Sequence, residues 1–226
     1  MLQHLDKFDS LGLKRKEIYE PWETSIVKRD LKSGDIFVDV GAHIGYYTML
    51  ASELVGPKGH VFAFEPAPEN YAILLRNIAS TRNITAYESA VSSKSGIADF
   101  YLSFISSGDN RLSKPSGKYD KISVKTITLD DYFSDDIDFI KIDTQGHELS
   151  VLEGMQRILR HSQNLKMLIE YEPILLHING IEPGLLIEIL KDYRFSISSS
   201  KTHDFRKCTI KNRKHCNLYC EKREHD

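Results

Sequence analysis

The chain has 226 residues, of which 41% are hydrophobic and 27% are charged, and its formal net charge at pH 7 is −2. These values are ordinary for a globular protein of one domain, with room for a small N-terminal addition. The nearly neutral charge argues against a general nucleic-acid binder, and no apolar stretch is long enough to predict a membrane span.

The N-terminal part, residues 1–33, is predicted to be a helical extension of the main domain, which would occupy residues 34–226. Apolar residues recur at helical spacing near its start, and a second helix is expected over residues 23–31. Residues 1–16 are charged and lack the apolar segment of a secretory signal.

The first predicted strand and the turn after it are the most informative stretch. The apolar residues 36–40 predict a buried strand, with the acid Asp39 near its end. Two glycines, Gly41 and Gly45, then lead into a helical pattern that begins near Tyr47. A glycine turn in this place presents backbone N–H groups and a helix N-terminus to a ligand, although an ordinary tight turn fits the same pattern.

A second acid follows the next predicted strand. Residues 60–64 form another short apolar run, and Glu65 and Pro66 come directly after it. In dinucleotide-binding folds an acid at this position accepts hydrogen bonds from ribose hydroxyls. Alternatively, Glu65 is a carboxylate exposed to solvent with no ligand, but the glycine turn upstream makes this alternative less favoured. A helix over residues 68–80 and a strand over residues 83–87 continue the α/β alternation.

Residues 93–124 interrupt this alternation. Strands are predicted over residues 96–102 and 122–127, and the polar segment 103–121 between them predicts a long loop. A loop of this length in a compact domain is either functional or disordered. Its arginine, Arg111, could hold a carboxylate or phosphate of a substrate, or could belong to a solvated loop that contacts nothing.

Acidic residues gather at the ends of two later strands. A buried strand is predicted over residues 137–143, so that Asp143 falls at its carboxyl end, where open α/β sheets bind ligands. The next turn leads into one helix that begins with His147 and Glu148, and the following strand ends at Glu170. We expect the three acids to converge on one crevice, although Glu148 could instead stabilise the N-terminus of its own helix.

The last part of the chain continues the same alternation. A helix is predicted over residues 182–193, followed by a strand over residues 195–199. A polar loop or hairpin is expected over residues 204–213, and a last strand over residues 217–221.

The three cysteines, Cys208, Cys216 and Cys220, all lie in this last part. Their odd number suggests reduced thiols and a cytoplasmic protein rather than a disulfide framework. A zinc site that includes His203 and His215 is disfavoured, because the cysteines do not have the spacing of a metal-binding pair.

Three blocks of sequence, in this order and spacing, resemble the FkbM family of S-adenosylmethionine-dependent methyltransferases: residues 38–48, 64–66 and 141–148. The resemblance extends from about residue 19 to the C-terminus. It implies a class I methyltransferase with a Rossmann-like α/β fold, in which a seven-stranded, mostly parallel sheet carries helices on both faces and the last strand inserts antiparallel. Residues 34–226 would then be the catalytic domain, with the N-terminal extension over the site.

The resemblance also implies where S-adenosylmethionine binds: at the glycine turn, the strand-end acids and the turn after the third strand. The residues expected to contact this cofactor are Asp39, Gly41, Ala42, His43, Gly45, Tyr47, Thr48, Glu65, Pro66, Ser89, Ala90 and Asp143. His43 departs from the general methyltransferase loop, which has glycine there, and from the FkbM pattern, which commonly has asparagine. It therefore needs a conformation open to a residue with a Cβ, and it either packs or points at the cofactor.

Methyl transfer to a hydroxyl requires alignment of the acceptor and removal of its proton. Asp143 is the first candidate for the base or orienting group, followed by Glu170 and His147. Acceptor-binding residues are expected to be Arg111, Glu148 and Glu20. A rival hypothesis is that Asp143, Glu148 and Glu170 bind a divalent cation such as magnesium or calcium.

The expected activity is O-methylation of a sugar, glycan or polyketide-like metabolite, so the partner is a small-molecule, glycan or lipid-linked hydroxyl acceptor. Two alternatives stay open. An NAD-dependent oxidoreductase also suits the glycine turn with Glu65, but the turn does not match the dinucleotide fingerprint. A non-catalytic S-adenosylmethionine-binding module would have no evident use for the acids near Asp143.

Overall fold

The computed structural model describes residues 18–104, 106–115, 118–199 and 215–222. The helix predicted at the start of the chain, the loop over residues 204–213, Cys208 and His203 lie outside the described residues. Within the described ranges, no helix is long and apolar enough to cross a membrane.

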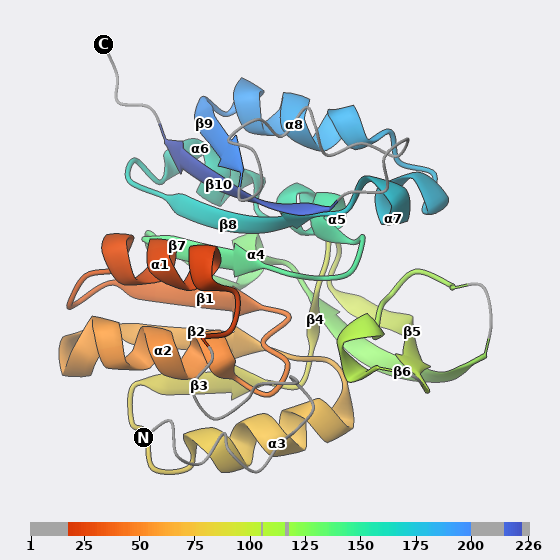
Figure 1. Cartoon of the computed structure of the whole chain (residues 1–226), viewed down its shortest axis with the longest axis horizontal. Coiled ribbons are helices and arrows are strands. Elements are labelled where there is room, and N and C mark those ends of the chain that lie inside the picture. Colours follow the sequence, from red (N-terminus) through yellow and green to blue (C-terminus); the bar gives the residue numbers. More distant parts are fainter. Residues whose placement is uncertain (1–17, 105, 116–117, 200–214, 223–226) are drawn as a thin grey trace.

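A seven-stranded sheet forms the centre of the molecule, with the strand order β3-β2-β1-β7-β8-β10-β9 (Figure 1). Its strands are β1 (Ile36–Val40), β2 (His60–Phe64), β3 (Ile84–Tyr87), β7 (Phe139–Ile142), β8 (Lys166–Tyr171), β9 (Phe195–Ser199) and β10 (Cys216–Lys222). Strand β10 pairs antiparallel with both of its neighbours, and the other pairs are parallel. The predicted class I sheet with an inserted antiparallel strand is therefore confirmed.

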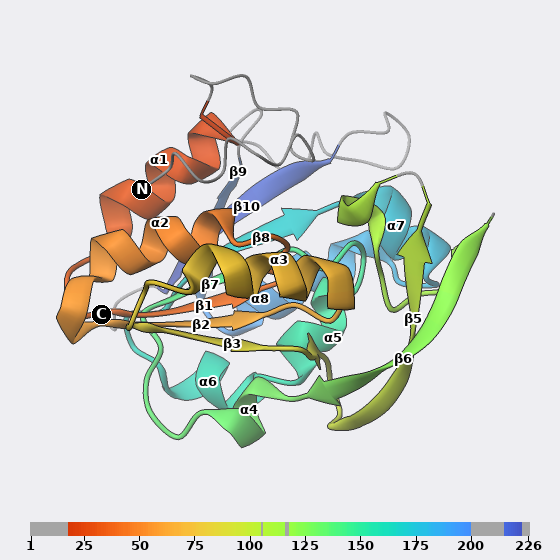
Figure 2. The ribbon, with the colours of Figure 1, turned by 90° about the horizontal axis from the view of Figure 1, so that it is seen from below.

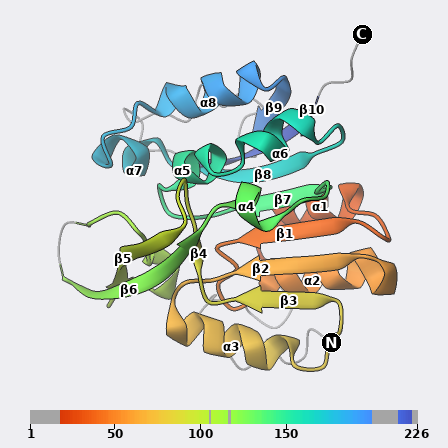
Figure 3. The ribbon, with the colours of Figure 1, turned by 180° about the vertical axis from the view of Figure 1, so that it is seen from behind.

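Helices cover both faces of this sheet, which explains why its central strands read as continuous apolar runs. One face carries α1 (Pro21–Asp30), α2 (Tyr46–Val55) and α3 (Pro68–Ile78). The other carries α4 (Leu129–Tyr132), α5 (Glu148–Glu153), α6 (Gln156–His161) and α8 (Pro183–Asp192) (Figures 2 and 3). The larger hydrophobic cluster packs α5, α6 and α8 on the sheet, and a second cluster packs α1 and α2 on the opposite face.

A second, three-stranded sheet lies beside the main one. Two of its strands were predicted, over residues 96–102 and 122–127, but their pairing in a separate sheet was not. This second sheet has the order β4-β6-β5 and contains β4 (Ala90–Val91), β5 (Gly96–Ser103) and β6 (Tyr119–Ile127). A short 3-10 helix, η4 (Ser107–Asp109), lies in the connection between β5 and β6. Figure 2 shows this sheet beyond the carboxyl ends of the parallel strands, where it walls one side of the site.

The predicted helix after Asp143 is wrong in one respect, because two short helices, α5 and α6, replace it. They separate at Gly154, where an added Cβ would lie 2.1 Å from the backbone oxygen of Ser92. The chain after β4 therefore passes so close that only glycine fits. Helix α7 (Pro173–Ile178) was not predicted either, and it begins with a proline at its first position. A short 3-10 helix, η3 (Gly56–Lys58), links α2 to β2.

Replacement of Gly41 by alanine should lower the free energy of unfolding by about 3 kcal/mol or more. Gly41 has φ +80°, and an added Cβ would lie 1.9 Å from the backbone oxygen of Asp143 on the neighbouring strand end. Urea unfolding would measure the loss. Gly184→Ala in α8 is the matched control, because an added Cβ there meets nothing within 4 Å; this change should stay within about 1 kcal/mol. Equal effects of the two substitutions would contradict the close approach at Gly41.

Candidate active site

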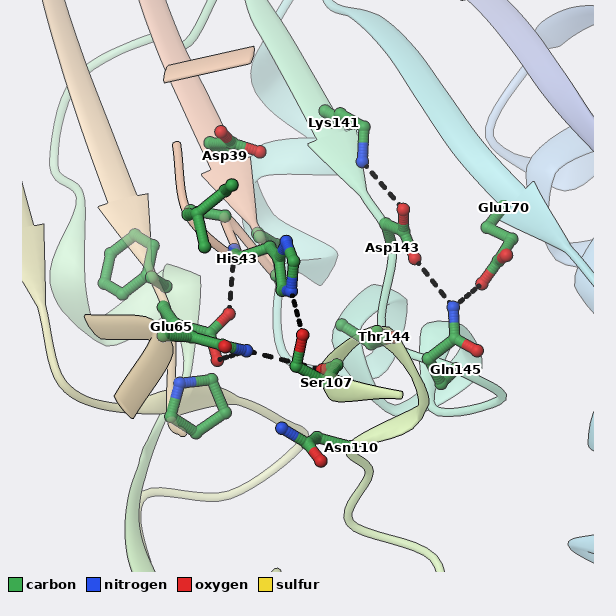
Figure 4. Close-up of a pocket in the computed structure, with 18 of the residues that line it drawn as sticks. Asp39, His43, Glu65, Ser107, Asn110, Lys141, Asp143, Thr144, Gln145 and Glu170 are labelled. Carbon is green, nitrogen blue, oxygen red and sulfur yellow. Dashed lines mark hydrogen bonds and ion pairs between the residues drawn. The ribbon is translucent and has the colours of Figure 1, made fainter. Parts of the chain in front are cut away.

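A cavity of about 330 Å³ opens at the carboxyl ends of β1, β2, β7 and β8, between these strands and the η4 segment (Figure 4). Strand β1 lies between β2 and β7. The chain continues from β1 to β2 and β3 on one side of the sheet, and the later strand β7 pairs with β1 on the other side. Open α/β sheets bind ligands at such a switch point. The site thus lies where the strand-end acids were expected to meet.

Most of the residues predicted for the site line this cavity. They are Glu20, Asp39, Gly41, Ala42, His43, Tyr47, Glu65, Pro66, Ala90, Asp143 and Glu170. Six other predicted residues are not part of its lining, namely Gly45, Thr48, Ser89, Arg111, His147 and Glu148.

The turn after β1 holds its shape through residues in left-handed backbone conformations. Gly41, His43 and Gly45 have φ values of +80°, +52° and +94°. Histidine, like asparagine and aspartate, is one of the residues with a Cβ that adopt this conformation more often than others, so His43 can occupy the turn. The ring of His43 also packs, because its Nε2 lies 2.9 Å from Ser107 Oγ in η4. His43 therefore ties the turn to the second sheet.

Glu65 is buried at the end of β2 and is held by backbone N–H groups. The amide of His43 donates to Oε2 at 2.8 Å, and the amide of Ala67 donates to Oε1 at 2.9 Å. Burial raises the pKa of this carboxyl to about 7, although the two backbone bonds oppose the shift. A ligand that donates hydroxyl groups here would favour the ionised carboxylate.

Asp39 has one carboxylate oxygen that is satisfied and one that is not. Thr48 Oγ1 donates to its Oδ2 at 2.6 Å, so Thr48 positions Asp39 instead of lining the cavity. The other oxygen, Oδ1, is buried and has no hydrogen-bond partner within the described part of the chain. Buried polar atoms without partners are rare in native proteins. An ammonium group of a ligand in the cavity would supply the missing donor.

Lys141 is a central residue that the sequence analysis missed. It lies in β7 with 5% of its surface exposed, and its Nζ is 3.0 Å from Asp143 Oδ2 and 4.9 Å from the centroid of the Tyr47 ring. Burial lowers the pKa of Lys141, but the carboxylates of Asp143, Asp39 and Glu20 outweigh this effect and raise it. Lys141 lies between apolar residues in a strand that is buried along its whole length. A lysine is almost never fully buried unless it is paired, and this was the sequence signal for its role.

Gln145 joins the two carboxylates that end β7 and β8. Its Nε2 donates to Asp143 Oδ1 at 3.1 Å and to Glu170 Oε2 at 2.9 Å, as the dashed lines in Figure 4 show. Gln145 has φ +54°, an uncommon conformation for a residue with a Cβ, and such conformations cluster at functional sites. The bridge keeps both acids facing one part of the cavity.

The two bridged carboxyl groups differ in proton affinity. Removal from water raises the pKa of Asp143, but the ammonium group of Lys141 and further hydrogen bonds lower it below its ordinary value. Removal from water and the charge of Asp143 raise the pKa of Glu170 well above its ordinary value. Two acids whose environments separate their pKa values in this way can take different roles in proton transfer.

Glu148 supports the turn between β7 and α5. Its buried Oε1 accepts hydrogen bonds from the amides of Thr144 and Gly146 at 3.1 and 3.0 Å, and from the Thr144 hydroxyl at 3.0 Å. Glu148 therefore fixes the turn that carries Gln145. Of the described residues, no group of three or more His, Cys, Asp and Glu side chains is arranged to hold a metal ion. The structure gives no support to the cation site predicted at Asp143, Glu148 and Glu170.

Other predicted residues make contacts outside the cavity. His147 Nε2 lies 3.0 Å from Ser92 Oγ, and burial lowers the pKa of this ring to about 4. Arg111 donates to the hydroxyl of Tyr119 at 3.0 Å within the second sheet. Ser89, which directly precedes β4, is buried. These placements favour supporting roles over direct contact with a ligand.

Known proteins share both the sequence pattern and the fold. A family model described as the methyltransferase FkbM domain matches residues 39–197. The chain is 26% identical over 181 residues to the hexuronic acid methyltransferase AglP of Haloferax volcanii, a match that covers 78% of this chain and 70% of that protein. It is 30% identical over 147 residues to the 2-O-methyltransferase NoeI of Sinorhizobium fredii, with 57% of this chain and 60% of that protein covered.

Two solved structures show the same architecture. The FkbM methyltransferase of Methylobacillus flagellatus KT matches with a TM-score of 0.56 and 22% identity, over 83% of this chain and 44% of that chain. This chain thus spans less than half the length of that protein. Fibrillarin of Aeropyrum pernix, solved with S-adenosyl-L-methionine bound, matches with a TM-score of 0.54 and 16% identity, over 88% of this chain and 74% of that chain.

The sheet topology and the family match define a class I S-adenosylmethionine-dependent methyltransferase. The chain belongs to the FkbM methyltransferase family, whose model covers most of it. The predicted family, fold class and enzyme class are confirmed. The alternative of an NAD-dependent oxidoreductase is set aside, because the matched family consists of methyltransferases.

Binding of S-adenosylhomocysteine should become tighter as pH rises through about 7, if Glu65 accepts hydrogen bonds from the ligand. The free protein holds Glu65 protonated below its pKa of about 7, and a hydroxyl-donating ligand binds the ionised form better. Calorimetric titrations at pH 6 and pH 8 would measure the affinity and the proton released. Glu65→Gln should flatten the pH dependence, whereas Glu69→Gln, on the exposed face of α3, should leave it unchanged. An unchanged slope in Glu65→Gln would remove Glu65 from the ligand site.

Proposed function

We propose that this protein transfers the methyl group of S-adenosylmethionine to a hydroxyl group of a sugar or glycan. The observation that carries the proposal is the bridged pair Asp143–Glu170, whose members differ in proton affinity and face one cavity. The relatives support a sugar acceptor, since one is named for a hexuronic acid and the other for methylation of an oxygen. A lipid-linked glycan or a polyketide-like metabolite would present the same hydroxyl chemistry.

The residues around β1 and β2 fit the cofactor. The turn at Gly41 and the end of β7 approach each other closely, because a Cβ at Gly41 would overlap the backbone oxygen of Asp143, and both residues line the cavity. The unpartnered Oδ1 of Asp39 suits the ammonium group of the cofactor's amino-acid part. Glu65 suits its ribose hydroxyls. When bound, S-adenosylmethionine supplies an electrophilic methyl group, and the C–S bond breaks as the acceptor oxygen takes that group.

Glu170 is the better candidate for the general base. A base must bind the hydroxyl proton, and of the two bridged acids Glu170 has the raised pKa and Asp143 the lowered one. Asp143 is a weaker base because Lys141 stabilises its ionised form. In this assignment Asp143 stays ionised and orients the acceptor hydroxyl, and Glu170 takes its proton. The salt bridge between Lys141 and Asp143 is the reason to prefer Glu170 over Asp143 as the general base.

The N-terminal extension contributes to the acceptor side of the cavity. Tyr19 and Glu20 line it, and Tyr47 donates a hydrogen bond to Glu20 Oε2 at 2.8 Å. Glu20 has φ +42°, so the segment before α1 turns sharply over the site. The described part of the extension thus supports a covering role and a contact between Glu20 and the acceptor.

Glu170→Gln should lower kcat by about 10²–10⁴-fold, the usual contribution of a general base, with little change in cofactor affinity. The wild-type rate should rise with pH, because the protonated carboxyl cannot accept the hydroxyl proton, and the variant should lose this rise. The measurement is S-adenosylhomocysteine release with glycoside acceptors, at several pH values.

Glu188→Gln, in an exposed position of α8, is the matched control and should retain wild-type kcat. A Glu170→Gln enzyme with the wild-type rate and pH profile would exclude Glu170 as the base. If the wild-type protein binds S-adenosylhomocysteine but methylates no glycoside, the proposed acceptor class fails.

A further inference from the structure

We infer that the acceptor group that enters this cavity is an uncharged, hydroxyl-rich sugar unit and that the site selects against acidic sugars. The inference rests on the proposed function and narrows its substrate class. It is carried by the charges on the cavity wall and by the contacts that Lys141 makes, the single lysine among the lining residues that the structure describes.

The wall of the cavity is rich in carboxylates. Asp39 and Glu65 lie on the side assigned to the cofactor. Four further acids line the cavity, one of them in η4: Glu20, Asp109, Asp143 and Glu170. The pKa of Asp143 is lowered, and Glu170 must be ionised to accept the hydroxyl proton, so an ionised acid on the acceptor would have to approach groups of its own charge in a partly buried site, which is unfavourable.

No cation in the described lining is available to balance such an acid. Lys141 is the single lysine or arginine among the described lining residues. It is 5% exposed, pairs with Asp143 at 3.0 Å, and lies against the Tyr47 ring. Burial lowers the pKa of His43, and its Nε2 already contacts Ser107. Arg111, the residue expected to hold an acidic acceptor, instead pairs with Tyr119 outside the cavity.

The same groups suit the hydroxyls of a neutral sugar. Carboxylate oxygens accept hydrogen bonds, and each sugar hydroxyl offers one O–H donor. Asp143 and Glu170 are held with their oxygens around the amide of Gln145, so neighbouring hydroxyls on one ring can meet both acids. Methyl transfer then forms an O–C bond at one hydroxyl and breaks the C–S bond of the cofactor, and the hydroxyl proton passes to Glu170.

Matched pairs of glycosides test this inference with the full chain and S-adenosylmethionine. The pairs are methyl galactoside with methyl galacturonoside, and methyl glucoside with methyl glucuronoside, measured at pH 8 by S-adenosylhomocysteine release. The neutral member should have a kcat/KM about a hundredfold higher, because the juxtaposition of like charges is costly. Equal or better turnover of the acids would overturn the inference but leave methyl transfer to sugars standing. Turnover of neither member, with cofactor binding intact, would instead reject the proposed function.

Two variants test whether wall charge causes the selectivity. Glu20→Gln and Asp109→Asn each remove one carboxylate, the first from the segment before α1 and the second from η4, and each should reduce the preference for the neutral member by several-fold. If one variant fails to fold, the other still tests the claim. Glu53→Gln, in an exposed position of α2, should keep the wild-type ratio. An unchanged ratio in a folded Glu20 or Asp109 variant would contradict an electrostatic origin.

Discussion

The buried ammonium group of Lys141 is the interaction on which the site depends. It stands between Asp143, Asp39 and Glu20 and lies over the ring of Tyr47. Without it, the carboxylates at the ends of β1 and β7 would be crowded together with no counter-charge, and an unpaired buried charge is strongly destabilising. The lysine therefore lowers the pKa of Asp143 in a cavity where removal from water alone would raise it.

Hydrogen bonds in the turn after β7 hold these charged groups in fixed positions. Glu148 accepts three hydrogen bonds from the turn and so fixes its backbone. This backbone holds Gln145 in a left-handed conformation, in which its side-chain amide donates one hydrogen bond to Asp143 and one to Glu170. The four residues thus form one connected unit, in which Glu148 positions the turn and Gln145 joins the two acids. A substitution of any one of them would alter the positions of the other three.

The sequence predicted those parts of the site that follow from where apolar strands end. Asp39, Glu65 and Asp143 were found because each comes at the end of a buried run, and parallel strands bring such ends to one edge. Roles that depend on side-chain direction were not predictable. Nothing in the local pattern distinguishes the wall residue Glu170 from the supporting residue Glu148, and the contact of His43 with Ser107 joins segments far apart in the chain. The break between α5 and α6 likewise depends on the close passage of Ser92, a tertiary constraint.

A carbon-13 NMR titration of the side-chain carboxyl groups tests the central claim, the unequal proton affinity of the bridged pair, most directly. Asp143→Asn and Glu170→Gln would assign the two resonances. The account predicts that Asp143 titrates below the ordinary range for aspartate and Glu170 well above that for glutamate. Ordinary titration of both groups, or the reverse order, would contradict it, and the division between an orienting acid and a proton acceptor would have to be abandoned.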